Sequence, residues 1–290
     1  MARKDIKSVL VIGGTGFIGS AVVARLSQTE LAQITVVHTS SLSHGRPSRA
    51  HYYRIDAKDA FVGDLMRDHD AIVLLASPDI TLMKQLVAMI RKARPRHVLY
   101  ASTVLLYDSK KDPAHEETPL RARNEYERAK LAEEKMVRAA LKSPIKLTIA
   151  RLGNVYGDVL NKGIIGNAFH ALHRENSIPV SGNVVRDYIF IDDVAEALTT
   201  LVLEPPQGNV EVINIATGIG TPLNTLLAGI EKIAGRKLTR IEGALRDESL
   251  HIVADIQKMK KRIGKPAFRL NEGLKETYRR FSAWYDNEKL

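Results

Sequence analysis

Tyr126 and Lys130 are the residues whose types and spacing could move a proton onto or off a small molecule. They stand four positions apart at the start of a predicted helix, residues 126–141, so both side chains project from one face. A phenol has a pKa of about 10, too high for a base at neutral pH. A neighbouring ammonium group lowers that pKa, so a tyrosine can take a proton from an alcohol or return one to a ketone.

Thr103 adds a hydroxyl to this pair. A short apolar run at residues 98–101 predicts a buried strand, and Ser102 and Thr103 follow it directly. In an open parallel sheet, ligands bind beyond the carboxyl ends of the strands. We therefore expect Thr103 to hydrogen-bond the reacting oxygen and to form the catalytic group with Tyr126 and Lys130.

A glycine-rich turn near the N-terminus predicts a cofactor. Gly13, Gly16 and Gly19 directly follow the apolar run at residues 9–12. The first glycine permits a tight turn, the second lets the backbone approach a pyrophosphate, and the third lets the next helix pack against the strand. This strand–turn–helix setting predicts a dinucleotide site for NAD or NADP. The candidate cofactor-binding residues here are Gly13, Thr15, Gly16, Phe17, Ile18, Gly19 and Ala76, with Tyr126 and Lys130 beside the nicotinamide.

The end of the second predicted strand, at His38, distinguishes the two cofactors. NAD-selective proteins carry a carboxylate there, which holds the ribose 2′-hydroxyl. Here hydroxyl residues follow His38 instead, and Arg46 and Arg49 come shortly after them. Hydroxyls and arginines without a carboxylate favour the 2′-phosphate of NADP. Alternatively, the two arginines are solvated loop residues. Asp56 either reaches the adenine amino group or caps a helix over residues 57–61. The candidates at this strand end are His38, Thr39, Ser40, Arg46 and Asp56.

The elements that must position these side chains alternate along the first half of the chain. Apolar runs predict buried strands, and amphipathic stretches between them predict helices, which together indicate a parallel sheet covered on both faces. The predicted strands are residues 9–12, 34–38, 72–75, 98–101 and 145–150, and the predicted helices are 18–27, 80–93 and 126–141. The fold class is α/β, a Rossmann-like doubly wound parallel sheet.

The second half is less regular and predicts a small mixed C-terminal lobe that binds the substrate. We expect a dinucleotide-binding domain over residues 1–160, to which residues 186–217 return, and the lobe over 161–290. The predicted helices are 164–174, 192–203, 222–234 and 271–285, and the predicted strands are 188–191 and 210–215.

Composition excludes several classes of function. The 290 residues are 44% hydrophobic and 26% charged, as in ordinary soluble proteins. The absence of cysteine excludes disulfides, a thiolate nucleophile and cysteine-ligated metal, and we expect no metal site. The net charge of +10 is scattered along the chain, so we expect no nucleic-acid partner. A membrane span needs about 20 continuous apolar residues, which this sequence lacks, so we expect a cytoplasmic protein without a membrane partner.

Taken in order, these motifs resemble the extended short-chain dehydrogenases/reductases, the family that includes nucleoside-diphosphate-sugar epimerases, dehydratases and ketoreductases. The resemblance covers almost the whole chain. Its further motifs are Ser102-Thr103 followed by Tyr107, the segments 151–157 (RLGNVYG) and 186–194 (RDYIFIDDV), Asn214-Ile215, and residues 254–255 and 270–274.

The resemblance implies a nucleotide-sugar substrate and residues that bind it. In the family, residues like Arg186, Tyr188 and Arg246 contact the diphosphate and the sugar, Asn154 lies near the phosphates, and Asn167 is a weaker candidate. A forked guanidinium suits a diphosphate. Alternatively, Arg186 pairs with Asp187 on the surface and Arg246 is an ordinary loop residue.

Departures from the family narrow the chemistry. Dehydratases carry Asp-Glu directly after the catalytic threonine, whereas this sequence has Val104-Leu105, which excludes water elimination by that route. Asp108 replaces the usual glycine after Tyr107, and the connection after Ser77 is short, which favours an open site.

We therefore expect NAD(P)-linked hydride transfer at a ring carbon, C4, of a nucleoside-diphosphate sugar, by an epimerase or a ketoreductase. Two alternatives are an NADPH-dependent reductase of a non-sugar carbonyl compound and a non-catalytic cofactor-binding protein. The resemblance also implies a homodimer that uses the helix at 126–141. Its apolar residues, which alternatively pack only within the chain, are Ala129, Leu131, Ala132, Met136, Val137 and Ala140.

Overall fold

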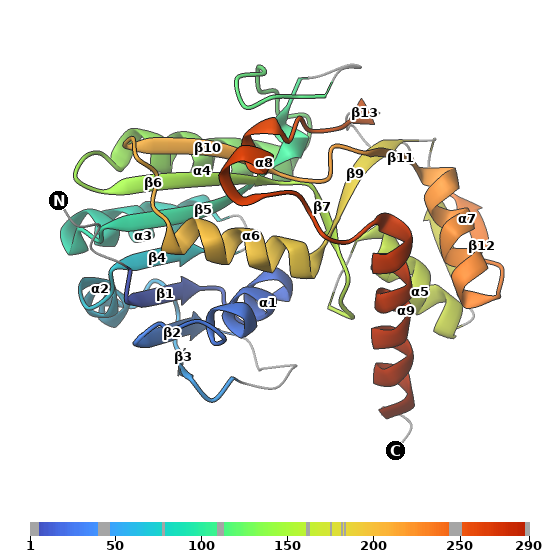
Figure 1. Cartoon of the computed structure of the whole chain (residues 1–290), viewed down its shortest axis with the longest axis horizontal. Coiled ribbons are helices and arrows are strands. Elements are labelled where there is room, and N and C mark those ends of the chain that lie inside the picture. Colours follow the sequence, from blue (N-terminus) through green and yellow to red (C-terminus); the bar gives the residue numbers. More distant parts are fainter. Residues whose placement is uncertain are drawn as a thin grey trace. The chain divides into compact units, whose positions relative to one another are not determined.

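The computed structural model describes residues 6–39, 47–76, 79–108, 113–160, 163–174, 176–180, 182, 184–243 and 251–287. The chain packs into two compact units (Figure 1). The first comprises Met1–Leu106, Glu125–Arg151 and Val194–Ile213, and the second comprises Tyr107–Asn124, Leu152–Asp193 and Asn214–Leu290. Each unit is described below by itself.

A seven-stranded sheet forms the centre of the first unit, with the strand order β10-β6-β5-β4-β1-β2-β3. The strands from β3 to β5 pair in parallel. Its inner strands are mostly apolar and almost fully buried because both faces of the sheet are covered. The strands are β1 (Ser8–Ile12), β2 (Gln33–His38), β3 (Ala50–Arg54), β4 (Ala71–Leu74), β5 (His97–Thr103), β6 (Lys146–Leu152) and β10 (Val210–Ile215).

Helices cover both faces of this sheet. On one face α2 (Ala60–Arg67) packs against α3 (Ile80–Ala93), and α3 packs against α4 (Glu125–Ala140). On the other face lie α1 (Phe17–Leu26) and α6 (Ile191–Leu203), which Figure 1 shows in front of the strands. A hydrogen bond from Arg25 to Glu196 joins these two helices. The predicted doubly wound α/β fold is confirmed.

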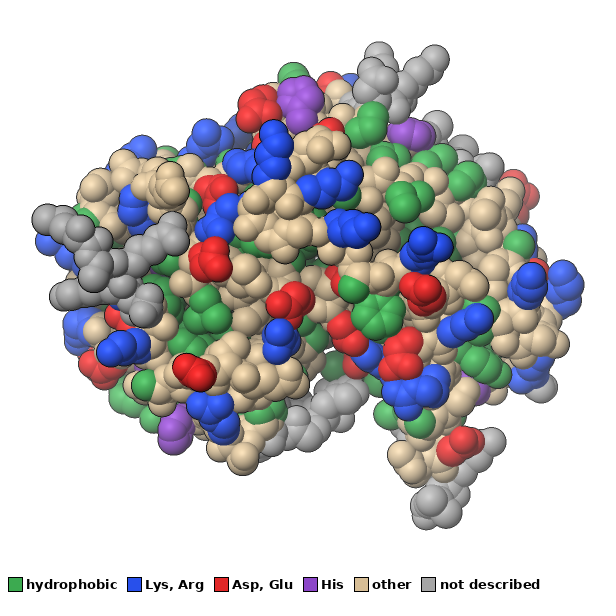
Figure 2. All heavy atoms as spheres, viewed as in Figure 1, with side chains coloured by type: hydrophobic (Ala, Val, Ile, Leu, Met, Phe, Trp, Pro, Cys, Tyr) green, Lys and Arg blue, Asp and Glu red, His purple; other side chains and the backbone are tan. Residues whose placement is uncertain are grey.

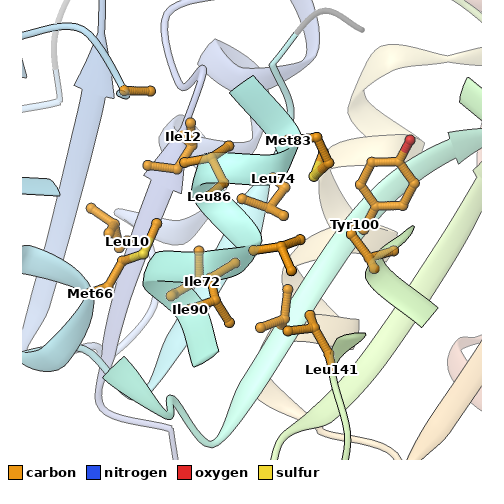
Figure 3. Close-up of a cluster of buried hydrophobic side chains, with 14 of the residues drawn as sticks. Leu10, Ile12, Met66, Ile72, Leu74, Met83, Leu86, Ile90, Tyr100 and Leu141 are labelled. Carbon is orange, nitrogen blue, oxygen red and sulfur yellow. The ribbon is translucent and has the colours of Figure 1, made fainter. Parts of the chain in front are cut away.

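Apolar side chains fix the layer of α2, α3 and α4 on the sheet (Figure 3). Leu10 and Ile12 of β1 point to this face because alternate residues of a strand share a face. Leu86 and Ile90, one turn apart on α3, meet them from the helix side. Each of these side chains is almost fully buried, so this cluster rigidly supports the carboxyl ends of the strands.

The second unit contains a small mixed sheet, as predicted for the C-terminal lobe. Its central strand β9 (Val185–Phe190) pairs in parallel with β7 (Asn154–Tyr156) and β13 (His251–Ile252), and antiparallel with β11 (Gly220–Pro222). A second pair of parallel strands is formed by β8 (Ser177–Val180) and β12 (Thr239–Glu242). The helices are α5 (Ile164–Arg174), α7 (Leu223–Ala234), α8 (Gln257–Ile263) and α9 (Leu270–Asn287).

Some element boundaries differ from the prediction. The strand β9 begins at Val185, three residues before the predicted start, so Arg186 and Asp187 are strand residues. The edge strand β3 was not predicted, because its sequence mixes polar and aromatic residues and its side chains are largely exposed.

Candidate active site

The glycine turn between β1 and α1 has the geometry that its spacing predicts. Gly13 has a φ of +83°, a conformation that favours glycine. A Cβ atom at this position would lie 2.9 Å from the backbone nitrogen of Ala76, so the segment that follows β4 approaches the turn closely. The N–H of Gly13 donates to the carbonyl of Val37 over 3.0 Å, which fastens the turn to β2. Gly16 is the N-cap of α1.

Gly19 lies at the closest approach of α1 to the turn. A Cβ atom there would lie 2.7 Å from the Cα of Gly14 and even nearer to the carbonyl oxygen of Gly13. Thr15 is buried, whereas Gly16 is exposed at the helix N-terminus. The first N–H groups of a helix have no intrahelical acceptor and attract anions. This close-packed turn therefore fits a dinucleotide pyrophosphate, and Phe17 and Ile18 lie in the first turn of α1 beside it.

The residues at the end of β2 that were predicted to bind the adenosine ribose have different environments in the structure. His38 is buried, and its ring lies edge-on to Tyr52 with 6.2 Å between centroids. Thr39 is exposed. The Arg49 guanidinium donates to three backbone carbonyls between α1 and β2, at 2.7 to 3.1 Å, so it serves the fold. Two other candidates, Ser40 and Arg46, lie outside the described residues.

Asp56 is exposed, and its carboxylate accepts the N–H of Lys58 over 2.9 Å. It is not the helix cap. Asp59 caps α2 instead, because its carboxylate accepts the N–H of Phe61 at the first turn. The alternative role predicted for Asp56 is therefore wrong, and its predicted contact with adenine stays a prediction.

The structure brings the three predicted catalytic side chains of the first unit together. Thr103 is the last residue of β5 and is buried, and Tyr126 lies in the first turn of α4 and is 46% exposed. Desolvation and then the charge of Glu133 raise the pKa of Tyr126 above that of a free phenol, and the interaction with the Thr103 side chain opposes them only in part. A further positive charge is needed to make the phenolate accessible at neutral pH.

Lys130 is the nearby cation, and its ammonium group is buried at the end of β5. Its Nζ atom donates to the carbonyl of Ala101 over 3.0 Å and to the hydroxyl of Tyr100 over 3.4 Å. It also forms an ion pair with Glu133 over 3.3 Å. Burial lowers the pKa of Lys130, while the charges of Glu133 and Glu134 oppose this shift.

Glu133 is a site residue that the sequence reasoning missed. Only 1% of it is exposed, and its Oε2 atom accepts the hydroxyl of Tyr100 over 2.8 Å besides pairing with Lys130. Its Oε1 atom accepts the N–H of Asp79, the N-cap of α3, over 2.8 Å. The carboxylate thus joins β5, α3 and α4.

A second missed group lies beside it. Glu134 accepts the hydroxyl of Ser102 over 2.7 Å and the Arg151 guanidinium over 3.2 and 2.5 Å. Glu134 and Arg151 are almost fully buried. The sequence held a signal for both glutamates, because Glu133 and Glu134 lie three and four residues after Lys130 and must share its helix face.

In the second unit, two predicted substrate residues lie side by side. Asn154 of β7 is paired in register with Tyr188 of β9. The side-chain oxygen of Asn154 is buried and finds no hydrogen-bond partner among the described residues. A buried polar oxygen without a partner is costly, so this atom is a candidate for binding a ligand donor.

Arg186 and Asp187 do not form the surface pair that was the alternative prediction. Both are buried, and consecutive residues of a strand point to opposite faces. Asp187 accepts N–H groups of Thr217 and Gly218 over 2.8 and 2.9 Å, and the Thr217 hydroxyl over 2.5 Å. Burial nevertheless raises the pKa of Asp187.

The remaining family motifs have different roles. Asn167 is exposed on α5, and Arg246 lies outside the described residues. Tyr107 donates its hydroxyl to the side-chain oxygen of Asn214 over 2.6 Å, and the amide of Asn214 donates to the carbonyls of Ala114 and Asp255 over 3.0 Å. Tyr107 and Asn214 therefore hold segments of the second unit together.

Among the residues that the structure describes, no three His, Asp or Glu side chains cluster as metal ligands would. Among the described helices, none is both long and apolar enough to span a membrane.

Comparisons with known proteins agree with the fold and the motifs. A sequence model described as the NAD dependent epimerase/dehydratase family matches residues 9–216. A UDP-glucose 4-epimerase of Lactobacillus helveticus is 26% identical, over 88% of this chain and 91% of the relative. The crystal structure of the Thermotoga maritima UDP-glucose 4-epimerase with UDP-glucose has a TM-score of 0.84 at 26% identity, over 96% of this chain and 99% of the other.

A more distant structure supports the fold alone. The UDP-glucose 4-epimerase of Thermus thermophilus, solved in complex with NAD, superposes with a TM-score of 0.83 at 21% identity. The superposition covers 95% of this chain and 99% of that one. The architecture therefore persists where few residues are shared.

Proposed function

The chain belongs to the NAD dependent epimerase/dehydratase family, and we propose that it is a 4-epimerase of UDP-sugars that uses NAD. Membership confirms the predicted family and enzyme class. One observation carries the proposal: the ammonium group of Lys130 is buried at the carboxyl end of β5, where it donates to the Ala101 carbonyl, on the same helix face as Tyr126 and two residues from Thr103 on the strand. Similarity to UDP-glucose 4-epimerases over about nine-tenths of the chain supports the substrate class.

The proposed mechanism rests on the chain's own residues. NAD, when bound at the glycine turn, supplies a hydride acceptor and later a hydride donor. Tyr126, as phenolate, takes the proton of the C4 hydroxyl when the sugar is oxidised, and returns it to the carbonyl oxygen when the sugar is reduced. Thr103 hydrogen-bonds the same oxygen, and Lys130, one helical turn after Tyr126, brings the positive charge that stabilises a phenolate. Val104 and Leu105 offer no acid or base for water elimination.

We propose NAD as the working cofactor in place of the predicted NADP preference. Arg49, the predicted 2′-phosphate ligand that the structure describes, is bound to three backbone carbonyls. His38 is buried beneath the strand end. Calorimetric titration with NAD and NADP tests this choice, and tighter binding of NADP would restore the sequence prediction.

We propose that the second unit binds the nucleotide sugar. The partnerless oxygen of Asn154 and the neighbouring Tyr188 supply polar groups on one sheet, and Arg186 supplies a cation from the same strand as Tyr188. The two other predicted residues, Asn167 and Arg246, remain candidates.

We also propose a homodimer formed through α4. Val137 is buried and Met136 packs against the core, whereas Leu131 is half-buried and Ala132 is exposed. The adjacent apolar residues Leu131 and Ala132 are therefore available to a partner helix. Sedimentation of Leu131→Glu tests this, because a charge in the contact should leave a monomer. A wild-type monomer would refute the dimer.

The decisive experiment incubates the purified protein with UDP-glucose and NAD and follows both the sugar and the cofactor. Formation of UDP-galactose without net change in the reduced-nicotinamide absorbance supports an epimerase. Net change in that absorbance indicates a ketoreductase instead. The control is Tyr126→Phe, which should lose about 10²–10⁴-fold in kcat while binding NAD normally. If no UDP-sugar binds or reacts, the proposal is wrong.

A further inference from the structure

We propose that Glu133 is a positioning residue for Lys130: its buried carboxylate fixes the ammonium group at the end of β5 and keeps it charged. The proposal rests on the proposed function, since Lys130 matters through the reaction of Tyr126. Nothing in the Y-x-x-x-K pattern requires an acid at this position.

The contacts of Glu133 are those of a fixed bridge. Its Oε2 atom lies 2.8 Å from the Tyr100 hydroxyl and 3.3 Å from Nζ of Lys130. Its Oε1 atom accepts the backbone N–H of Asp79, where α3 begins. The carboxylate therefore cannot rotate away from the lysine without losing a hydrogen bond to a neighbouring element.

The neighbouring Glu134 shows why Glu133 has a separate role. Both glutamates are almost fully buried, and a buried carboxylate needs a compensating charge. Arg151 binds Glu134 through two nitrogens. The cation in contact with Glu133 is Lys130 itself. The two carboxylates are thus each paired with one cation: Glu134 with Arg151, and Glu133 with the catalytic lysine.

The same contacts orient the ammonium group. The ammonium group of Lys130 donates to the Ala101 carbonyl and to the Tyr100 hydroxyl, and it forms an ion pair with Glu133. The contact with Tyr100, at 3.4 Å, is the longest of the three. It is therefore the one most readily exchanged for a ribose hydroxyl, while Ala101 and Glu133 keep hold of the lysine.

Glu133 also acts on the charge of Lys130. Burial favours the neutral amine, whereas a carboxylate 3.3 Å away favours the ammonium. Removal of the carboxylate charge should therefore make the lysine lose its proton at lower pH. The ionisable groups that contact or act on Lys130 are Glu133 and Glu134 of α4 and Tyr100 of β5. Two further groups contact these glutamates: Asp79, at the start of α3, contacts Glu133, and Arg151 of β6 contacts Glu134.

The test uses Glu133→Gln, which keeps the size of the side chain and an acceptor for Asp79 but removes the charge. In protein carrying 13C-labelled lysine, the Cε signal of Lys130, assigned by its loss in Lys130→Arg, is titrated without substrate. We expect it to titrate at lower pH in Glu133→Gln than in the wild type. In Glu133→Asp, which keeps the charge, the Lys130 signal should titrate at a pH closer to that of the wild type than in Glu133→Gln.

Val137→Ala is the matched control, because Val137 lies one turn further along the buried face of α4 and carries no charge. It should lower the melting temperature and leave the Lys130 titration unchanged. In kinetics, Glu133→Gln should lower kcat by up to about 100-fold and move the alkaline limb of its pH profile to lower pH. Val137→Ala should move neither.

An unchanged Lys130 titration in Glu133→Gln would overturn the inference. So would an equal shift in Val137→Ala, because it would assign the effect to lost stability. The titration needs no turnover. A wild-type protein that fails to epimerise UDP-sugars refutes the proposed function and leaves this measurement decisive for Glu133.

Discussion

Gly16 and Gly19 belong to one glycine motif, but substitution by alanine should have different effects at the two positions. Gly19→Ala should mainly lower stability, whereas Gly16→Ala should mainly weaken the binding of NAD. Alanine at Gly19 puts a Cβ atom 2.7 Å from the Cα of Gly14, where carbon atoms in contact stand about 3.5–4.0 Å apart. The turn must therefore move by about 1 Å. Alanine at Gly16 meets nothing closer than 3.4 Å, and the φ of −74° at this residue suits any side chain.

The energies follow from these distances. Overpacking costs about 1–3 kcal/mol, and we take the upper end for Gly19→Ala because the nearest atoms belong to the backbone. Alanine recovers about 1 kcal/mol over glycine inside a helix, which leaves a loss of about 2 kcal/mol. For a chain of this size that loss lowers the melting temperature by roughly 4–8 °C. Gly16→Ala should cost less than about 1 kcal/mol, since it alters only an N-cap.

Two measurements separate these effects. Thermal unfolding without cofactor should show the large loss in Gly19→Ala and little change in Gly16→Ala. Calorimetric titration should show NAD binding weakened about tenfold or more in Gly16→Ala, because its methyl group occupies the point where the turn meets the pyrophosphate. A Gly19→Ala protein with the wild-type melting temperature, or a Gly16→Ala protein with the larger loss, would refute this reasoning.

Three further predictions test other parts of the molecule. Asn154→Ala removes the partnerless oxygen and should raise KM for UDP-glucose about tenfold while NAD affinity in calorimetry stays the same. Arg151→Met leaves Glu134 buried without its cation, and urea unfolding should show a loss of about 3–5 kcal/mol, largely recovered when Glu134→Leu is added. Burial lowers the pKa of His69 below 6.5, so the unfolded chain binds a proton that the native protein does not. Stability should therefore fall as the pH drops through 6.5 towards the native pKa, and His69→Gln should flatten that profile in urea unfolding.

The sequence predicts best those features that depend on short-range sterics. Gly13 has the positive φ that a tight turn needs, and Gly19 lies at the close approach of helix and turn, as the motif predicts. The buried strands were equally clear, because continuous apolar runs fit a sheet covered on both faces. The Thr103–Tyr126 contact followed once both elements were assigned.

What sequence reasoning missed depends on contacts between distant segments. Arg49 follows the end of β2 in the sequence and so looks like a ligand for the 2′-phosphate of NADP. In the structure its guanidinium instead donates to carbonyls about 20 residues earlier in the chain. Asp56 and Asp59 are both residue types that cap helices. The backbone of the loop before α2 decides between them, because it brings the carboxylate of Asp59 to the N–H of Phe61. Neither outcome follows from spacing alone.

The helix α4 is the clearest case in which the sequence did not predict which side chains are buried. Its sequence suggests an apolar inner face and a solvated charged face, since buried charges are rare. In the structure the inner face contains Lys130, Glu133 and Glu134, while Leu131 and Met136 remain partly exposed. Well-packed apolar residues often stabilise a core as much as buried ion pairs do, so stability alone does not require these charges. Their position around Lys130 instead matches a chemical requirement, because a lysine that must stay protonated inside a protein needs acids beside it.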